Sequence, residues 1–260
     1  KLKALRTRSC VIGKREIPMS KNFVLVHGAW HGGWCWNETK ALLESQGHSV
    51  EAPDMPSHGN DSTNVNDVTL ADCVDRVVAS VENLEGKVVL VGHSLGGVII
   101  SAVAERMRAR IEELVFVCAM VPKSGESAND CGRSNVASVL RGNLVPAEDG
   151  KSLTLKPAFI PMAFYHDCAE EDQREATSKL CPQSTAVFSE PVTLTDENFG
   201  AISKHYIECL EDQAVHIVSQ REMAAGANCE LVTSLNTGHS PFMASPEALV
   251  LALISDVPED

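Results

Sequence analysis

The chain has 260 residues and a formal net charge of −13 at pH 7. Its length suits one large α/β domain or two small domains, and 44% hydrophobic with 22% charged residues is an ordinary balance for a globular protein with a substantial core. The negative charge argues against nucleic acid as a partner, because nucleic acid selects basic surfaces. No apolar stretch approaches the ~20 residues that a membrane helix needs, so we expect no membrane partner either.

The start of the chain differs in charge from the rest. Residues 1–21 contain seven Lys or Arg against the single acid Glu16, a local charge of +6. We expect residues 1–20 to be an N-terminal extension outside the fold, with a processed transit peptide as the alternative, because such segments are rich in arginine and poor in acids.

The nine cysteines are odd in number, and no C-x-x-C pair occurs. This usage is typical of buried thiols in a reducing compartment rather than of a disulfide framework. We therefore expect a cytoplasmic protein.

Short apolar runs alternate with segments of helical length in the first half of the chain. Runs rich in β-branched residues predict strands at 23–28, 48–54, 87–92 and 112–120. Apolar residues at helical spacing predict helices at 35–47, 69–84 and 95–110. Such alternation predicts a parallel sheet covered by helices on both faces, in which KVVLVG, apolar on both sides, is a central strand.

The alternation stops between residues 122 and 200, where six prolines and the acidic cluster AEEDQRE predict an insertion of short helices and loops. We expect this insertion to be a cap over the carboxyl edge of the sheet. Beyond it the pattern predicts strands at 204–210 and 228–235, a helix at 213–226 and a last helix after Ser245. The predicted core therefore comprises 21–121 and 201–260, with 122–200 as the cap.

Residues 92–96 read GHSLG, a G-x-S-x-G motif between a predicted strand and a predicted helix. This context is what a nucleophile elbow requires, because a tight turn lifts the serine clear of the strand end. We predict that Ser94 is a nucleophile and that Gly92, Gly96 and Gly97 relieve crowding around it. A glycine-rich turn with a solvent-exposed serine is the alternative.

A serine hydroxyl needs a base to become a nucleophile. Among nine histidines, His239 stands apart because TSLNTGHSPF places it in the loop after the last predicted strand. Loops that follow parallel strands converge at the carboxyl edge of the sheet, where Ser94 is also expected. We predict His239 as the base, and a loop-capping histidine is the alternative.

The imidazole in turn needs a carboxylate that fixes its tautomer and stabilises the imidazolium. The segment YIECLEDQAV offers Glu208, Glu211 and Asp212. Glu208 falls within a predicted strand, whereas Asp212 follows it and precedes the next helix. Asp212 is therefore the predicted acid, with Glu211 as the alternative.

An acyl-transfer site also needs two N–H donors for an oxyanion. One predicted donor is the N–H of Leu95, directly after the serine. The other is the N–H of Ala29 in the loop HGAWHGGW, where Gly28 allows close backbone approach and Trp30 is expected near the substrate.

His27 and His31 in the same loop are four residues apart, a spacing that can suggest metal ligands. They lie on a glycine-rich loop rather than on a helix, so the spacing does not place them on one face. We predict no metal site there.

These motifs resemble the α/β-hydrolase superfamily and, more narrowly, its branch of hydroxynitrile lyases, plant methylesterases and similar small bacterial esterases. The stretches that carry the resemblance are FVLVHGAWHGGWCW, LVGHSLGG, FYHDCAEEDQREATSKLCPQ, YIECLEDQAV and TGHSPFMASPEAL. The resemblance implies an α/β-hydrolase fold, with a mostly parallel sheet, helices on both faces and a small helical cap. It also implies a Ser94–His239–Asp212 triad and no cofactor, and the chain order Ser, Asp, His matches that of the superfamily.

Two positions separate members of this branch. Its lyases carry Thr after the first-loop histidine and Lys after the catalytic histidine, where this chain has Gly28 and Ser240. A lysine cation would stabilise the cyanide that a lyase releases, so its absence favours ester hydrolysis.

The sequence therefore predicts a carboxylic-ester hydrolase acting on small to medium hydrophobic esters through an acyl-enzyme. A cyanohydrin-splitting lyase and a non-catalytic ligand receptor are the alternatives. The candidate pocket residues are Gly28, Trp30, Met120, Phe159 and Phe164; cap core is the alternative interpretation of the two phenylalanines. A small-molecule ester is the expected partner, and a homodimer is an open alternative to a monomer.

Overall fold

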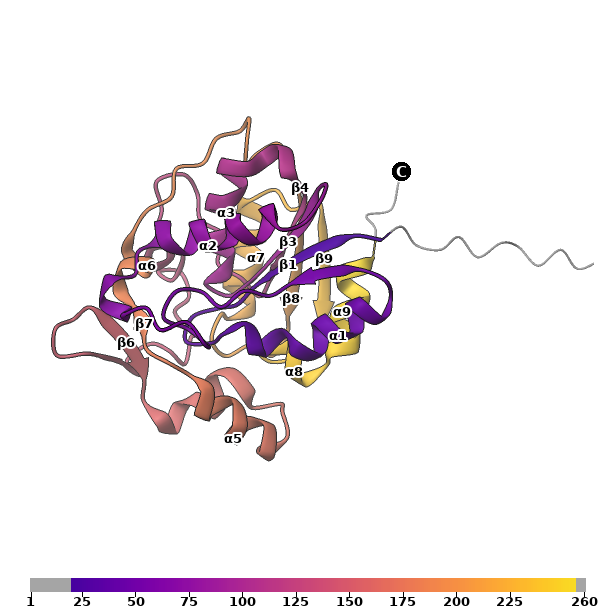
Figure 1. Cartoon of the computed structure of the whole chain (residues 1–260). Helices are drawn as coiled ribbons and strands as arrows, with labels where there is room; N and C mark the ends of the chain where they lie inside the picture. Colours follow the sequence, from indigo (N-terminus) through magenta and orange to yellow (C-terminus); the bar gives the residue numbers. More distant parts are fainter. Residues whose placement is uncertain (1–19, 256–260) are drawn as a thin grey trace, which may run out of the picture.

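The computed structural model describes residues 20–255. Of the expected N-terminal extension, residues 1–19 lie outside the described residues. The described part forms a central sheet with helices on both faces and an insertion between two of its strands (Figure 1).

Six parallel strands form the central sheet in the order β2-β1-β3-β4-β8-β9. Their bounds are β1 Asn22–Val26, β2 Ser49–Glu51, β3 Val88–His93, β4 Ile111–Val117, β8 Ser203–Cys209 and β9 Leu231–Leu235. The chain runs outward from β1 to β2 and then returns to β3, so the connections leave β1 and β3 in opposite directions. Ligand sites of parallel sheets lie at such a switch point, beyond the carboxyl ends of the strands.

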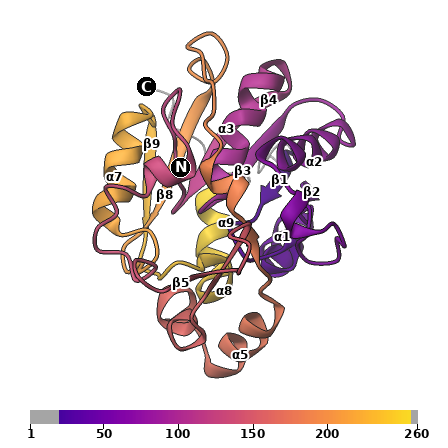
Figure 2. The same cartoon turned by 90° about the vertical axis from the view of Figure 1, so that its left-hand side faces the viewer.

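Side chains alternate between the two faces of the sheet, and each face is covered by its own helices. These helices are α1 Asn37–Ser45, α2 Leu70–Glu82, α3 Gly96–Met107, α7 Ile217–Gly226 and α9 Pro246–Ile254. Val24 and Leu90 lie on the face covered by α2, α3 and α7, and Phe23 and Val89 lie on the face covered by α1 and α9. Figure 2 shows the helices of both faces around the strands, with α7, α3 and α2 at the left, top and right, α9 near the centre and α1 at the lower right.

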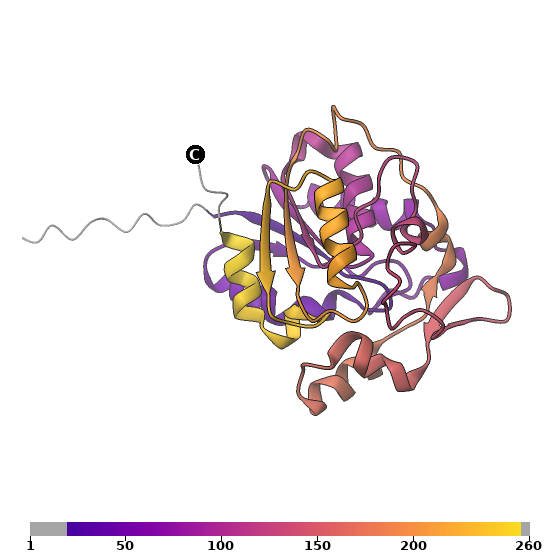
Figure 3. The ribbon, with the colours of Figure 1, turned by 180° about the vertical axis from the view of Figure 1, so that it is seen from behind.

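Between β4 and β8 the chain forms a group of short elements beyond the carboxyl end of the sheet (Figure 3). They are α4 Ala128–Cys131, β5 Leu144–Pro146, β6 Ser152–Leu155, a 3-10 turn Pro157–Phe159, a π-helix Pro161–Tyr165, α5 Glu170–Lys179, β7 Gln183–Ser184 and α6 Thr185–Ser189. β5, β6 and β7 pair as a three-stranded antiparallel sheet. The sequence predicts only short helices and loops here, so this sheet is a correction; strands of two to four residues are too short to show alternation.

Three 3-10 turns and one short helix complete the described chain: Gly33–Trp36, Val65–Asp67, Arg108–Arg110 and α8 Pro241–Ala244. The eight cysteines within residues 20–255 are free thiols. No helix formed by these residues combines the length and the apolar composition that crossing a membrane requires.

Candidate active site

Ser94 lies in the turn between β3 and α3. Its φ is +52°, in the left-handed region that a non-glycine residue enters at a cost of about 1–2 kcal/mol. The turn is held by the end of β4 and the loop after it, because Ser94 N–H donates to the carbonyl of Val117 (3.2 Å) and Ser94 carbonyl accepts from Met120 N–H (2.9 Å). The serine therefore has the strained, externally supported backbone of a nucleophile elbow.

The glycines of the elbow each lie against backbone that a side chain would strike. A Cβ on Gly92 would lie 2.7 Å from the carbonyl oxygen of Gly96. One on Gly96 would lie 2.6 Å from the carbonyl oxygen of Val26, and one on Gly97 would lie 2.3 Å from that of Met120. These distances are shorter than carbon and oxygen tolerate, so the crowding predicted from the sequence is confirmed.

The structure brings His239 and Asp212 together. His239 Nδ1 lies 2.7 Å from Asp212 Oδ2, and both residues are buried. With Nδ1–H donated to the carboxylate, Nε2 keeps the lone pair that a base needs. Of the two other acids, Glu208 is paired with Arg221 (2.8 Å) and Glu211 is exposed. Asp212 is the acid of this segment that contacts the histidine.

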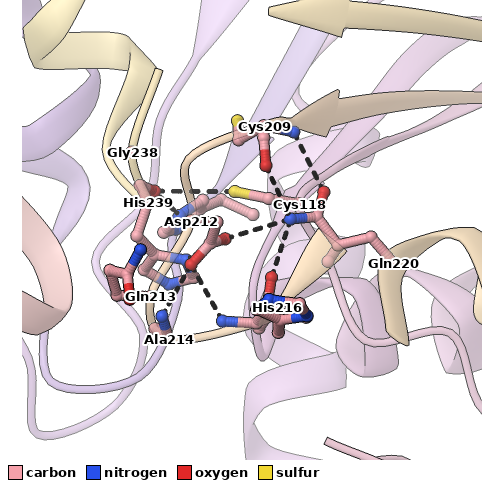
Figure 4. Close-up of polar contacts among 12 residues, drawn as sticks. Cys118, Cys209, Asp212, Gln213, Ala214, His216, Gln220, Gly238 and His239 are labelled. Atoms are coloured by element: carbon pink, nitrogen blue, oxygen red, sulfur yellow. Dashed lines mark hydrogen bonds and ion pairs between the residues drawn. The ribbon is translucent and has the colours of Figure 1, made fainter. Parts of the chain in front are cut away.

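Backbone and side-chain donors surround the Asp212 carboxylate (Figure 4). Its Oδ1 accepts the N–H groups of Ala214 (2.7 Å) and Val215 (2.9 Å). Gln220, fully buried in α7, places Nε2 3.4 Å from Oδ2 and donates to the carbonyl of Val215 (2.7 Å). Gln220 belongs to none of the sequence motifs; the available signal is a polar residue on the sheet-facing side of α7.

His93, the residue before the serine, connects the elbow to the loop of His239. Its Nε2–H donates to the His239 carbonyl (2.8 Å), and the two ring centroids are 4.6 Å apart. Burial holds the pKa of His93 well below its usual range, so the ring is neutral and carries a single N–H. Within residues 20–255 no hydrogen bond joins Ser94 Oγ to His239 Nε2. Such catalytic bonds often tighten only when substrate binds.

The loop after β1 passes directly against the serine. A Cβ on Gly28 would lie 2.8 Å from Ser94 Cβ and 2.8 Å from His93 Nδ1, so only glycine fits there. This loop carries the N–H of Ala29, and the elbow carries the N–H of Leu95. Among residues 20–255, neither N–H donates to a protein acceptor, which leaves both available to a substrate oxygen.

The histidine pair of that loop is already bonded within the protein. His27 Nδ1–H donates to the carbonyl of Gly28 (2.8 Å), and Nε2 accepts the N–H of Met55 (3.0 Å). Both nitrogens of His31 are likewise engaged at 2.8 Å. No nitrogen of the pair remains for a metal ion.

A second group has donor atoms spaced closely enough for a metal. His93, Cys118 and His239 offer one atom each, all within 4.8 Å of one another. Burial raises the pKa of the Cys118 thiol well above its usual range, whereas a metal binds the thiolate. His93 Nε2 and His239 Nδ1 already donate to protein oxygens. These residues therefore do not suit a metal ion.

Two cavities adjoin Trp30, whose indole N–H donates to the carbonyl of Leu153 (2.9 Å). The larger has about 340 Å³, and its apolar lining includes Trp30, Met120, Leu140, Leu153 and Phe188. The smaller has about 140 Å³, and Trp30 and Phe164 line it. The ring of Phe164 also lies 5.6 Å from that of His239 between centroids. Trp30, Met120 and Phe164 are thus placed beside the candidate catalytic residues.

Phe159 is half-buried and lines neither of these cavities. A larger hollow of about 700 Å³ lies between the segments 121–134, 194–204 and 222–230. Its lining contains none of the residues predicted for the site, and it is mixed in charge. The cavities beside the candidate site are therefore identified by the residues that line them, not by their volume.

Known proteins are similar to this chain in sequence and in fold. Residues 23–253 match a family model described as the alpha/beta hydrolase family. Salicylic acid-binding protein 2 from Nicotiana tabacum is 32% identical over 249 residues, which cover 90% of this chain and 96% of that protein. Methylesterase 1 from Arabidopsis thaliana is 31% identical over 250 residues, covering 90% and 95%. The solved structure of polyneuridine aldehyde esterase superposes with a TM-score of 0.82 at 25% identity, over 90% of this chain and 98% of that one.

The chain belongs to the alpha/beta hydrolase family. Within it, the relatives place the chain in the branch of the plant methylesterases, and it is a hydrolase of the esterase type. The fold and family predicted from the sequence motifs are confirmed.

Proposed function

We propose that the chain is a serine carboxylesterase in which Ser94, His239 and Asp212 form a catalytic triad. The buried His239–Asp212 pair carries the proposal, with 2.7 Å between Nδ1 and Oδ2. His93 connects this pair to a serine held at positive φ. A protein that only binds a ligand needs no imidazole whose tautomer is fixed for proton abstraction.

In the first half-reaction His239 Nε2 takes the proton of Ser94 as Oγ attacks the ester carbonyl carbon. The N–H groups of Ala29 and Leu95 hold the developing oxyanion. His239 then gives its proton to the alkoxide, which leaves as an alcohol. In the second half-reaction the same imidazole deprotonates water, which attacks the acyl-enzyme and releases the carboxylic acid. These steps use groups of the chain and water, with no cofactor.

In this proposal residues 21–121 and 201–260 form the catalytic core, and residues 122–200 form a cap over it. The cavity beside Trp30 and Met120 supports an apolar substrate of small to medium size, because an apolar lining favours the burial of hydrocarbon. The name of the relative methylesterase 1 supports an ester with a small alcohol part.

A lyase that splits cyanohydrins is the competing function, and two positions disfavour it. Threonine in place of Gly28 would press its Cβ to within 2.8 Å of Ser94 Cβ, so the lyase residue does not fit this elbow. Ser240 supplies no cation where the lyases carry lysine. Ester hydrolysis is therefore the favoured function of the two.

The remaining expectations concern where and with what the protein works. The cytoplasmic location rests on the use of cysteine, and eight free thiols within residues 20–255 are compatible with it. It stays a prediction, as does a homodimer, which sedimentation at micromolar concentration would detect.

The decisive experiment combines labelling with a fluorophosphonate and turnover of p-nitrophenyl acetate. The wild-type chain should be labelled at residue 94 and should hydrolyse the ester. Ser94→Ala should lose the label and roughly 10³-fold or more of kcat. Ser101→Ala is the matched control, because the Ser101 hydroxyl donates to the Gly97 carbonyl within α3 (2.7 Å), and it should keep both properties.

Full activity in Ser94→Ala would eliminate the proposed mechanism. Release of cyanide from mandelonitrile without ester turnover would establish the lyase instead. Tight binding of an ester without turnover would identify a receptor. Profiling of p-nitrophenyl esters by chain length, with aromatic methyl esters alongside, then defines the substrate.

A further inference from the structure

Three consecutive residues of the insertion each bond a different loop of the candidate active site. Tyr165 is the last residue of the π-helix, and His166 and Asp167 follow it directly. Successive residues of a helical turn point about 100° apart, so neighbours in sequence can reach separate loops. Figure 3 shows this segment beyond the carboxyl ends of β8 and β9.

Tyr165 reaches the loop after β1. Its hydroxyl donates to His31 Nε2 (2.8 Å), and His31 Nδ1–H donates to the carbonyl of Ala29 (2.8 Å). Burial lowers the pKa of His31 to about 4, so near neutral pH the ring has one N–H to donate and one lone pair to accept. These two bonds fix the carbonyl of the residue whose N–H is the proposed oxyanion donor.

His166 reaches the loop after β8. Its Nε2–H donates to the carbonyl of Glu211 (3.0 Å). Glu211 directly precedes Asp212, the proposed acid. The backbone that presents the acid is therefore bonded to the insertion.

Asp167 reaches the loop after β9. Its Oδ2 accepts the N–H of Gly238 (2.6 Å), and Gly238 directly precedes His239. A Cβ on Gly238 would lie 2.7 Å from Asp167 Oδ1 and 2.8 Å from His166 Nε2. The insertion thus touches the backbone before the base so closely that no side chain fits between them.

Core packing does not explain the contacts of His166 and Asp167, because both residues are exposed, whereas Tyr165 is buried in the core. At the exposed Glu211, water could satisfy the backbone carbonyl equally well. What water cannot supply is a fixed distance between the two loops.

We propose that Tyr165, His166 and Asp167 form a positioning clamp that sets the placement of the oxyanion donor, the acid and the base relative to one another. The clamp rests on the proposed triad and adds residues that act through it without touching the reacting atoms. It also makes the insertion more than a cover for substrate: any shift of this tripeptide moves three catalytic loops together.

Variants of Asp167 test the clamp. Asp167→Ala removes the acceptor, whereas Asp167→Asn keeps an oxygen in the same place. Asp172→Ala changes an exposed acid in the first turn of α5 and is the matched control. In Asp167→Ala we expect kcat for p-nitrophenyl acetate to fall about 10–100-fold with KM changed less than about twofold, because misplacement costs rate rather than ground-state binding. The asparagine should restore kcat to within about threefold of wild type.

Two further readouts accompany these rates. Labelling of Ser94 by the fluorophosphonate should slow by the same factor as kcat, because it needs the oriented base. His166→Ala should lower kcat independently, through the loop of the acid. Thermal midpoints should stay within about 3 °C of wild type, as expected for changes at exposed positions.

Wild-type kcat in Asp167→Ala would overturn the clamp, and so would an effect confined to KM, which would indicate a substrate contact. A loss of kcat that asparagine does not restore, together with a lower thermal midpoint, would indicate general destabilisation and would also overturn it. Failure of the proposed function is distinct, because Ser94→Ala would then remain active.

Discussion

Replacing Gln220 by leucine should destabilise the protein strongly while leaving most of the catalytic geometry in place. The side chain is 0% exposed, and its amide joins α7 to the end of β8 (Figure 4). Its Oε1 accepts the N–H of Cys209 (3.0 Å). Its Nε2 donates to the carbonyls of Cys209 (3.0 Å) and Val215 (2.7 Å). Leucine fills a similar volume and makes none of these bonds.

The expected loss follows from the groups left behind. Gln220→Leu strands two buried backbone groups, the N–H of Cys209 and the carbonyl of Val215, whereas the Cys209 carbonyl still accepts the N–H of Asp212 (3.4 Å). At about 1–3 kcal/mol for each stranded group, the free energy of unfolding should fall by at least about 2 kcal/mol. That is a large part of the roughly 5–15 kcal/mol typical of a folded protein. At about 2–4 °C per kcal/mol, the thermal midpoint should fall by at least about 4 °C.

Activity should suffer less than stability. The bond from Gln220 Nε2 to Asp212 Oδ2, at 3.4 Å, is the longest of the four that the carboxylate receives. The other three remain in the variant. We therefore expect kcat of the folded enzyme at low temperature to fall less than about tenfold.

Urea unfolding followed by circular dichroism measures the stability change. Gln213→Leu makes the same replacement in the loop before α7, where Gln213 Nε2 donates to the carbonyl of Glu211 (3.1 Å) at an exposed site. Water can replace that bond, so the control should lose less than about 0.5 kcal/mol. A Gln220→Leu variant whose free energy of unfolding lies within about 1 kcal/mol of wild type would contradict the cost assigned to the unpaired backbone groups.

Two further perturbations test the elbow and the buried histidines. Gly97→Ala should lower kcat/KM for p-nitrophenyl acetate about 10²-fold, because its Cβ would lie 2.3 Å from the Met120 carbonyl oxygen and must displace the elbow. Gly226→Ala is the control and should leave kcat/KM unchanged, because the nearest atom to its Cβ would be 3.7 Å away. Burial lowers the pKa of six histidines in the described part of the chain: His27, His31, His48, His58, His93 and His205. The unfolded chain binds these protons near pH 6.5 and the folded chain only at lower pH, so stability is present above that pH and is lost on acidification. Between pH 7.5 and 5.5 the four most strongly shifted of these, His27, His31, His93 and His205, should each cost about 1.4 kcal/mol in urea unfolding, about 5.5 kcal/mol together. Equal midpoints at both pH values would contradict this.

The core of the fold could be predicted because its signals are local. Every strand and helix predicted outside the insertion is present, and the largest difference at an end is at α7, which begins at Ile217 rather than 213. The small sheet of the insertion could not be predicted in the same way. Its β6–β7 pairing joins Ser152 to Ser184, 32 residues apart, through strands too short to carry a pattern.

Candidate reacting groups can be proposed from the sequence because chemistry restricts their residue types. Ser94 followed from a motif, and His239 from its place after the last strand. The choice between Glu211 and Asp212 rested on one position in the sequence, and the 2.7 Å contact of Asp212 with His239 agrees with it. Phe159 shows where this reasoning fails, because an aromatic residue in an insertion gives no indication of the direction in which it points.

Residues that hold the reacting groups are harder to recognise, because they bond backbone. Gln220 binds the carbonyl of Val215, His166 that of Glu211, and Asp167 the N–H of Gly238. Every residue has a carbonyl, and all but proline have an N–H, so the sequence does not indicate which of these groups will be bonded. Substitutions outside the motifs that impair catalysis should therefore concentrate at side chains bonded to the backbone just beside the acid, the base and the oxyanion donor. Contacts of that kind can be identified only from the folded structure, even where the sequence indicates the chemistry that they support.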